Sequence, residues 1–258
     1  MHQDPRPLAS TLIGIALGDA LGLPHEGLSA RRIARRLGGK PPRPGLLPGL
    51  MMVSDDTDHA AMALGAWRDS GGDSDKFVRI LARRFRWWFA ALPPGVGLAT
   101  AKATIRLWLG WSPLRSGSAS AGNGPLMRSA IIGVVLRDDA KRRRMAVDLS
   151  SRLTHTDERA LDSARILAEA CAHLSTCGRP VDSRTFCSVL ADQASTPEVR
   201  RLLEALAAGP KDGESVSDFL FTRVLGRSDP IGDSARAVSG YAPESLAGAA
   251  AHGRRGCA

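Results

Sequence analysis

The chain has 258 residues, of which 43% are hydrophobic, and it carries a formal net charge of +9. A chain of this length buries roughly three quarters of the surface that its unfolded form exposes, so it can form one large domain without disulfides or structural metals. Ala, Leu, Arg and Gly are abundant, whereas strand-favouring residues are scarce, with one Tyr and six Phe. The composition therefore predicts an all-α fold, with residues 1–258 in a single domain.

The positive charge favours an anionic partner without identifying it, because a basic surface concentrates phosphates by long-range attraction. The densest basic runs, Arg31–Arg36 and Lys141–Arg144, are more typical of solvated helix faces than of a nucleic-acid interface. We therefore predict no specific nucleic-acid partner.

Cysteine spacing and the N-terminal segment predict the compartment. The four cysteines are Cys171, Cys177, Cys187 and Cys257. They show no Cys-x-x-Cys pair and no partnered histidine, which argues against a zinc site and a disulfide scaffold and predicts a reducing cytoplasm. The apolar run from Leu8 to Leu17 is shorter than a membrane span, and Asp4 with its neighbouring prolines is unlike a signal-peptide start. We predict no membrane partner.

Apolar residues recur at helical spacing along most of the chain, and no alternating strand pattern competes. The first helix is predicted to be buried and to run from Leu8 to Leu21, with Pro24 stopping the pattern. A basic amphipathic helix from Ser29 to Leu37 precedes a Gly/Pro-rich loop at residues 38–49. Further helices are predicted at Asp55–Trp67, Ser74–Ala91, Leu98–Trp108, Pro125–Leu136, Asp139–Leu153, Asp157–Ser175, Ser183–Ala194 and Pro197–Ala207.

A hydroxyl and two adjacent carboxylates, Ser54, Asp55 and Asp56, stand at the beginning of a predicted helix. Oxygen ligands suit Mg²⁺ or Ca²⁺, and two carboxylates about 4 Å apart repel by roughly 4 kcal/mol at an effective dielectric of 20, which a bound cation reverses. The same residues are equally consistent with Ser54 as an N-cap and the acids as partners of the helix dipole. His59 is predicted to be an ordinary helical side chain, because magnesium sites rarely use imidazole.

Three further segments offer polar groups at turns. Glu26 follows a Gly/Pro turn and could act as a general acid or base, although an ordinary loop acid is the commoner explanation. The turn Gly122–Gly124 opens a helix and could hold a phosphate on its N–H groups, or be a plain Asn-Gly loop. His155, between two helices, could contact a ligand, and Thr156 beside it could simply cap the next helix.

The order of these segments is more specific than any one of them. A Gly-Asp-Ala-x-Gly-x-Pro-x-Glu turn is followed by Asp-Asp-Thr, by Gly-Asn-Gly-x-x-Met-Arg and then by Thr-His. From about Leu12 to Leu246 the chain resembles the ADP-ribosylglycohydrolase family, which includes the dinitrogenase reductase-activating glycohydrolase and the ADP-ribosyl-acceptor hydrolases. The resemblance implies a compact orthogonal helical domain with a cleft for ADP-ribose. It also implies magnesium-dependent removal of ADP-ribosyl groups by cleavage at the anomeric carbon of ribose.

The resemblance also implies roles for individual residues. Two Mg²⁺ ions are expected, with Ser54, Asp55 and Asp56 as the first group of ligands, and Glu26 is expected to be the catalytic acid or base. The expected partner is ADP-ribose or an ADP-ribosylated protein. The residues implied to bind ADP-ribose are Gly122, Asn123, Gly124, His155 and Tyr241.

One expected motif does not follow Tyr241. The resemblance implies a second acidic motif of the Gly-Asp-x-Asp-Thr kind there, but residues 249–258 contain no acid, and Asp229 and Asp233 precede Tyr241 at a different spacing. We expect these two acids to form turns and cap helices instead. We therefore expect a C-terminally shortened domain with weak or single-metal binding, and an uncovered apolar groove that favours self-association.

Two other functions remain open from the sequence. The first is a catalytically impaired ADP-ribose-binding or regulatory relative of the same family, which the missing acids favour. The second is a helical structural protein with capped acidic turns, which would bind neither ADP-ribose nor Mg²⁺.

Overall fold

The computed structural model describes residues 5–44, 52–93, 95–177, 181–215, 218–226 and 241–252. Within these ranges the regular secondary structure is helical, and the extended pairing consists of two isolated bridges rather than a strand. The predicted all-α fold is confirmed for this part of the chain. Asp229 and Asp233 lie outside the described residues.

Helices follow one another along the chain with short connections. The elements are α1 (Arg6–Gly22), η1 (Leu23–His25), α2 (Ala30–Leu37), α3 (Asp55–Asp69), α4 (Ser74–Ala90), α5 (Leu98–Trp108), α6 (Leu126–Val135), α7 (Ala140–Arg152), α8 (Glu158–Thr176), α9 (Ser183–Gln193), α10 (Pro197–Ala208), η2 (Phe219–Val224) and α12 (Ala242–His252). Every helix predicted from the sequence begins and ends within two residues of its predicted bounds. The short helices η2 and α12 were not predicted.

Local capping explains why these boundaries could be predicted. In six helices a side chain just before the helix accepts a hydrogen bond from a backbone N–H in the first turn, which satisfies a group that has no partner inside the helix. These capping residues are Ser29, Ser54, Asp73, Asp139, Asp157 and Asp182. At its other end, α2 stops at Gly38, which has a left-handed φ of 54°.

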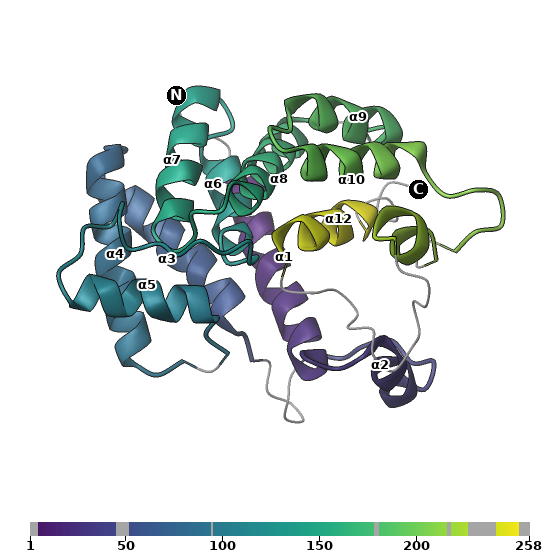
Figure 1. Ribbon diagram of the computed structural model, residues 1–258, viewed down its shortest axis with the longest axis horizontal. Helices are drawn as coiled ribbons and strands as arrows, with labels where there is room; N and C mark the ends of the chain where they lie inside the picture. Colours follow the sequence, from purple (N-terminus) through teal and green to yellow (C-terminus); the bar gives the residue numbers. More distant parts are fainter. Residues whose placement is uncertain are drawn as a thin grey trace.

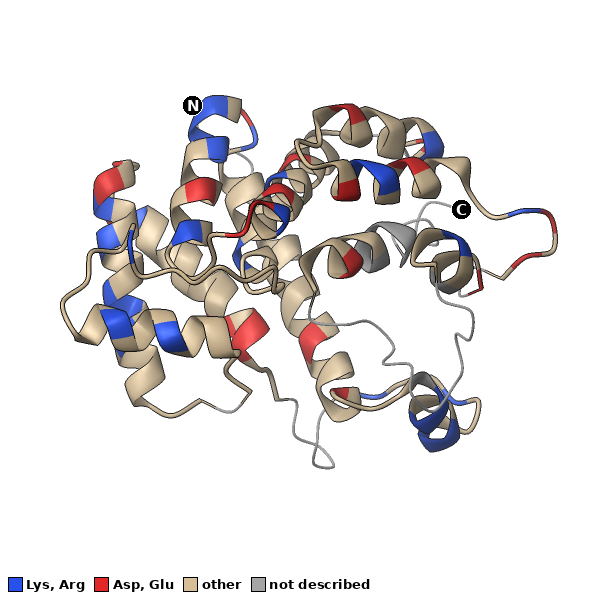
Figure 2. Cartoon of the chain, in the orientation of Figure 1, with Lys and Arg blue, Asp and Glu red and all other residues tan. Residues whose placement is uncertain are grey.

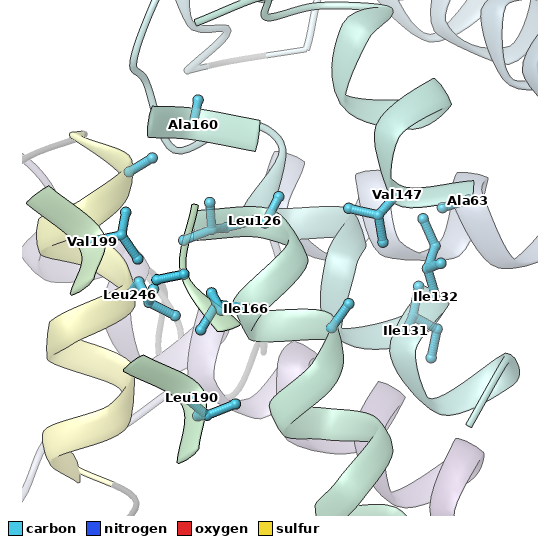
Figure 3. Close-up of a cluster of buried hydrophobic side chains, with 14 of the residues drawn as sticks. Ala63, Leu126, Ile131, Ile132, Val147, Ala160, Ile166, Leu190, Val199 and Leu246 are labelled. Atoms are coloured by element: carbon cyan, nitrogen blue, oxygen red, sulfur yellow. The ribbon is translucent and has the colours of Figure 1, made fainter. Parts of the chain in front are cut away.

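The helix pair α6 and α8 forms the centre of the molecule (Figure 1). Helices α3 and α7 pack against this pair, α4 and α5 lie beyond α3, and α9 and α10 pack together on the opposite side. Figure 3 shows part of one extended cluster of buried apolar side chains, with Ile166 of α8 near Val199 of α10 on one side and Ile132 of α6 near Val147 of α7 on the other. The core therefore links both halves of the described chain.

Helix α1 is more exposed than predicted. Its buried residues are Asp19 and Ala20, whereas Ile13 is 67% and Leu17 45% exposed. The prediction of a buried first helix is wrong, because α1 packs on α3 and α6 through one side and its apolar residues cover both sides. By length and composition alone, the helical segment Arg6–His25 is long and apolar enough to cross a membrane. A core helix of a soluble protein can meet the same two criteria.

The α6–α8 contact offers a test of the packing. A Cβ added to Gly133 in α6 would lie 2.3 Å from the backbone oxygen of Ala168 in α8. Gly133→Ala should therefore force the helices apart and lower the free energy of unfolding by about 1–3 kcal/mol in urea denaturation.

The matched control is Gly14→Ala in α1, where no atom lies within 4 Å of an added Cβ. We expect this variant to be as stable as the wild type or up to about 1 kcal/mol more stable, because Ala favours helix over Gly. Equal effects of the two substitutions would contradict the close approach of α6 and α8.

Candidate functional site

A carboxylate from the end of α1 holds the beginning of α3. Asp19 Oδ2 accepts hydrogen bonds from the backbone N–H groups of Ser54 (2.8 Å) and Thr57 (3.2 Å) and from Thr57 Oγ1 (2.6 Å). Its Oδ1 accepts from Ser54 Oγ at 2.8 Å. Asp19 is only 9% exposed, and bonds from four donors to a buried carboxylate fix the first turn of α3 relative to α1.

Ser54 is the N-cap of α3, which agrees with one of the two interpretations of the sequence. Its Oγ accepts a hydrogen bond from the backbone N–H of Asp56 at 3.5 Å while donating to Asp19. Asp55 and Asp56 occupy the first turn, where Asp55 is 8% exposed and Asp56 is half-buried. Both acids therefore sit at the positive end of the helix, partly shielded from water.

Crowding of negative charge marks this end of α3. Burial, followed by the negative charge of Glu26, raises the pKa of Asp55 to about 6. Burial, followed by the charges of Asp55, Asp19 and Glu26, raises the pKa of Asp56 to about 7. Figure 2 shows acidic residues at the start of α3 and on the neighbouring end of α1, apart from the basic surfaces of α4 and α5. The charge of Glu26 thus disfavours ionisation of both Asp55 and Asp56, and the charge of Asp55 disfavours ionisation of Asp56.

The donor atoms suit a hard cation, but the described residues complete only part of a metal site. Ser54, Asp55 and Asp56 offer hydroxyl and carboxylate oxygens, the ligands that Mg²⁺ prefers, and a cation would offset the repulsion between the acids. Among the residues that the structure describes, however, no three His, Cys, Asp or Glu side chains converge as a metal-binding group.

The loop between α4 and α5 borders the acidic cluster, which the sequence analysis did not predict. Gly95 has a φ of 79°, and a Cβ at this position would lie 4.0 Å from Asp55 Oδ1. In the next turn of α3, Asp58 Oδ2 accepts a hydrogen bond from Trp88 Nε1 at 3.0 Å. The Gly-Val-Gly sequence after two prolines was the only signal for this loop, and it does not by itself identify a neighbour.

The Gly-rich turn before α6 packs against the ring of His155. A Cβ on Gly122 would lie 3.0 Å from His155 Nε2, and one on Gly124 would lie 2.7 Å from His155 Cε1. Glycine at both positions therefore allows the backbone to approach the imidazole ring, which is nearly buried at 3% exposure. Asn123 lies between them, and its backbone oxygen accepts from the N–H of Leu126 at 2.9 Å, which closes the turn into α6.

Tyr241 joins the same turn from the far end of the described chain. It forms an antiparallel bridge with Gly122, and the N–H of Ala242 donates to the oxygen of Ala121 at 2.8 Å. Arg159 lies over the Tyr241 ring at 5.6 Å and donates to its hydroxyl at 3.3 Å. Burial and a hydrogen bond to Glu198 raise the pKa of Tyr241 to about 12, so the hydroxyl stays protonated.

A buried arginine connects the two halves of the candidate site. Arg128 in α6 donates to His59 Nδ1 (3.3 Å) in α3 and to Thr154 Oγ1 (2.9 Å), next to His155. His59 lies one turn after the acidic cluster and is completely buried, as a packed helical histidine. The sequence analysis quoted Arg128 within a motif and Asp19 within another, but it assigned neither of them a contact.

The described residues thus form an all-helical domain with an acidic helix start and a Gly-rich turn backed by a histidine. The model of the ADP-ribosylglycohydrolase family matches residues 6–256. The chain belongs to the ADP-ribosylglycohydrolase family.

Two similar proteins set the scope of this assignment. An uncharacterized protein of Archaeoglobus fulgidus is 30% identical over 201 residues, which cover 75% of this chain and 60% of that protein. A solved structure described as an ADP-ribosylglycohydrolase-related protein complex superposes with a TM-score of 0.65 and 25% identity, covering 97% of this chain and 75% of the other. The chain thus spans about 60% of the length of the Archaeoglobus relative.

The raised pKa values of Asp55 and Asp56 predict how the free energy of unfolding depends on pH in the presence of EDTA, which removes metal ions. In the unfolded chain Asp55 and Asp56 lose their protons near pH 4, whereas in the folded protein they keep them to about pH 6 and 7. At these two side chains the folded state therefore binds more protons in this window, so their contribution to the free energy of unfolding should fall by roughly 1–3 kcal/mol as pH rises from about 4 to about 7.5, against the opposite contribution of the buried, neutral His59 and His155. Added Mg²⁺ should restore stability above pH 7 but have little effect at pH 4.

Asp56→Asn should gain stability relative to the wild type as pH rises through this window, as measured by urea denaturation at each pH. Asp75→Asn, which removes an exposed acid from the first turn of α4, is the matched control and should follow the wild-type profile. An Asp56→Asn profile that stays parallel to that of the wild type would contradict the crowding of carboxylates at α3.

Proposed function

We propose that this protein is a magnesium-dependent hydrolase that removes ADP-ribosyl groups from a modified acceptor by cleaving the bond at the anomeric carbon of ribose. The observation that supports this most directly is the crowding of Glu26, Asp55 and Asp56 at the start of α3, where burial and the charge of Glu26 raise the pKa of both aspartates. Membership of the ADP-ribosylglycohydrolase family names the substrate class that such a site would act on.

The chemistry requires an acidic site of this kind. Cleavage at the anomeric carbon passes through a cation-like transition state, which nearby carboxylates stabilise while one of them handles a proton. Ser54, Asp55 and Asp56 would hold magnesium, which when bound supplies polarisation of a water molecule and a template for the ribose hydroxyls.

We propose Glu26 as the residue that transfers the proton. It follows η1 directly, its side chain is exposed, and its charge acts on both Asp55 and Asp56. An exposed carboxylate can reach a substrate, whereas Asp19 is engaged with four donors at α3 and cannot. We therefore assign the general acid or base to Glu26 and a positioning role to Asp19.

The Gly-rich turn would bind the rest of the ligand. Gly122, Asn123 and Gly124 stand at the N-terminal end of α6, where backbone N–H groups and the helix dipole favour a diphosphate. The His155 ring packs on this turn and the backbone of Tyr241 pairs with Gly122, so both residues adjoin the turn. We propose that these five residues hold ADP-ribose.

A second candidate is an ADP-ribose-binding or regulatory relative with impaired catalysis. It is favoured by the incomplete metal-binding group among the described residues, because two acids and a hydroxyl leave about half of the six positions of magnesium to water. This candidate retains ADP-ribose binding at the Gly-rich turn without turnover.

Glu26→Gln separates catalysis from binding. We expect release of ADP-ribose from a modified protein in the presence of Mg²⁺ to fall at least about 100-fold, since the amide cannot transfer the proton. The Kd for ADP-ribose in calorimetry should stay close to that of the wild type, because Glu26 is not part of the Gly-rich turn.

Glu204→Gln, an exposed acid on α10, is the matched control and should leave turnover unchanged. Full activity of Glu26→Gln would remove Glu26 from its role. Wild-type protein that binds ADP-ribose without releasing it from the modified substrate would support the second candidate instead.

A further inference from the structure

Arg128 is a buried cation that the proposed chemistry does not use. Its side chain is completely buried in α6, so it cannot touch a ligand, and burial lowers its pKa to about 9. Among the described residues its hydrogen-bond partners are a histidine, a hydroxyl and a backbone carbonyl, and none is a carboxylate. Burying an arginine without a carboxylate partner costs free energy, so the contacts of Arg128 require a structural explanation.

Arg128 is the donor in each of its hydrogen bonds. A guanidinium group only donates hydrogen bonds. His59 Nδ1, 3.3 Å from Arg128 Nη1, must therefore accept, which leaves the ring proton of His59 on Nε2. Arg128 Nη2 donates to Ser150 O (3.0 Å) and to Thr154 Oγ1 (2.9 Å), while the Phe85 ring packs 5.2 Å from the guanidinium carbon.

The direction of hydrogen-bond donation can also be assigned between Thr154 and His155. Because Thr154 Oγ1 accepts from Arg128, its own proton points to another acceptor. His155 Nδ1 lies 2.9 Å away, whereas the carbonyl oxygen of Ser151 lies 3.5 Å away, at the limit of a hydrogen bond. The shorter contact favours donation from Thr154 to Nδ1, so the proton of the neutral His155 ring is on Nε2.

His155 is also held in its neutral form. Burial, followed by the positive charge of Arg128, lowers the pKa of His155 to about 3. Its Nε2 faces Gly122 and Gly124, where a side chain would lie within about 3 Å of the ring. Within the described chain no hydrogen bond engages Nε2, so this N–H is directed to the turn where the ligand is proposed to bind.

We propose that Arg128 and Thr154 are positioning residues that hold His155 as the Nε2–H tautomer, so that it donates a hydrogen bond to an oxygen of the ligand at the Gly-rich turn. The identity of that ligand as ADP-ribose rests on the proposed function, whereas the tautomer rests on the hydrogen bonds alone. The site would thus recognise a ribose hydroxyl or diphosphate oxygen through a neutral donor rather than through an imidazolium charge.

Thr154→Val tests the proposal because it removes the hydroxyl and keeps the shape of the side chain. The first measurement is ¹⁵N NMR of the histidine rings at neutral pH, with His155 assigned from the spectrum of His155→Gln. We expect an Nε2–H pattern in the wild type and in Thr154→Ser, and a loss of this fixed pattern in Thr154→Val. Calorimetry with ADP-ribose should give a Kd about tenfold weaker for Thr154→Val and within about twofold of wild type for Thr154→Ser.

Thr156→Val is the matched control, because the same substitution two residues along the loop does not touch His155 Nδ1; both readouts should match the wild type. An Nδ1–H pattern in the wild type, or an unchanged pattern or unchanged affinity in Thr154→Val, overturns the proposal. If the wild type shows the Nε2–H pattern but binds no ADP-ribose, the proposed function fails while the assigned tautomer stands.

Discussion

The acidic half of the site depends on the four hydrogen bonds that the Asp19 carboxylate accepts from Ser54 and Thr57. They bring the end of α1 to the start of α3, although the two segments are 35 residues apart in the sequence. Since η1 and Glu26 follow α1 directly, the same contact brings Glu26 close to Asp55 and Asp56. The crowding of carboxylates is therefore a consequence of how two helices are joined.

A second buried aspartate shows what capping alone requires. Asp162 in α8 accepts from the backbone N–H groups of Ser195 and Thr196 and from Thr196 Oγ1, which holds the beginning of α10 as Asp19 holds α3. One carboxylate from another helix is sufficient for this purpose. At α3 that carboxylate is Asp19, so Asp55 and Asp56 are not needed as caps, although both complement the helix dipole as Glu198 does in the first turn of α10. What distinguishes α3 is that its two acids are partly buried next to a third carboxylate, Glu26.

Helices were predictable because their ends are set by local residues, such as Asp73 before α4 and Gly38 after α2. The exposure of α1 could not be predicted from the sequence. Its apolar residues lie on both sides of the helix, so the pattern does not show which side packs against the core. In the site, the order of the motifs indicated the family, and the structure brings the Gly-rich turn, His155 and Tyr241 together. The contacts of Asp19 and Arg128 were missed, because they join segments that are distant in the sequence.

The two halves of the site respond differently to protons. On the acidic side, burial and the charge of Glu26 raise the pKa of Asp55 to about 6 and that of Asp56 to about 7. On the side of the Gly-rich turn, burial and the charge of Arg128 keep His155 neutral down to about pH 3. Ligand binding at the turn should then involve no proton exchange with the histidine. A pH dependence of ligand binding between about pH 5 and 8 would therefore not arise from His155, even though histidine is the residue that usually titrates in that range.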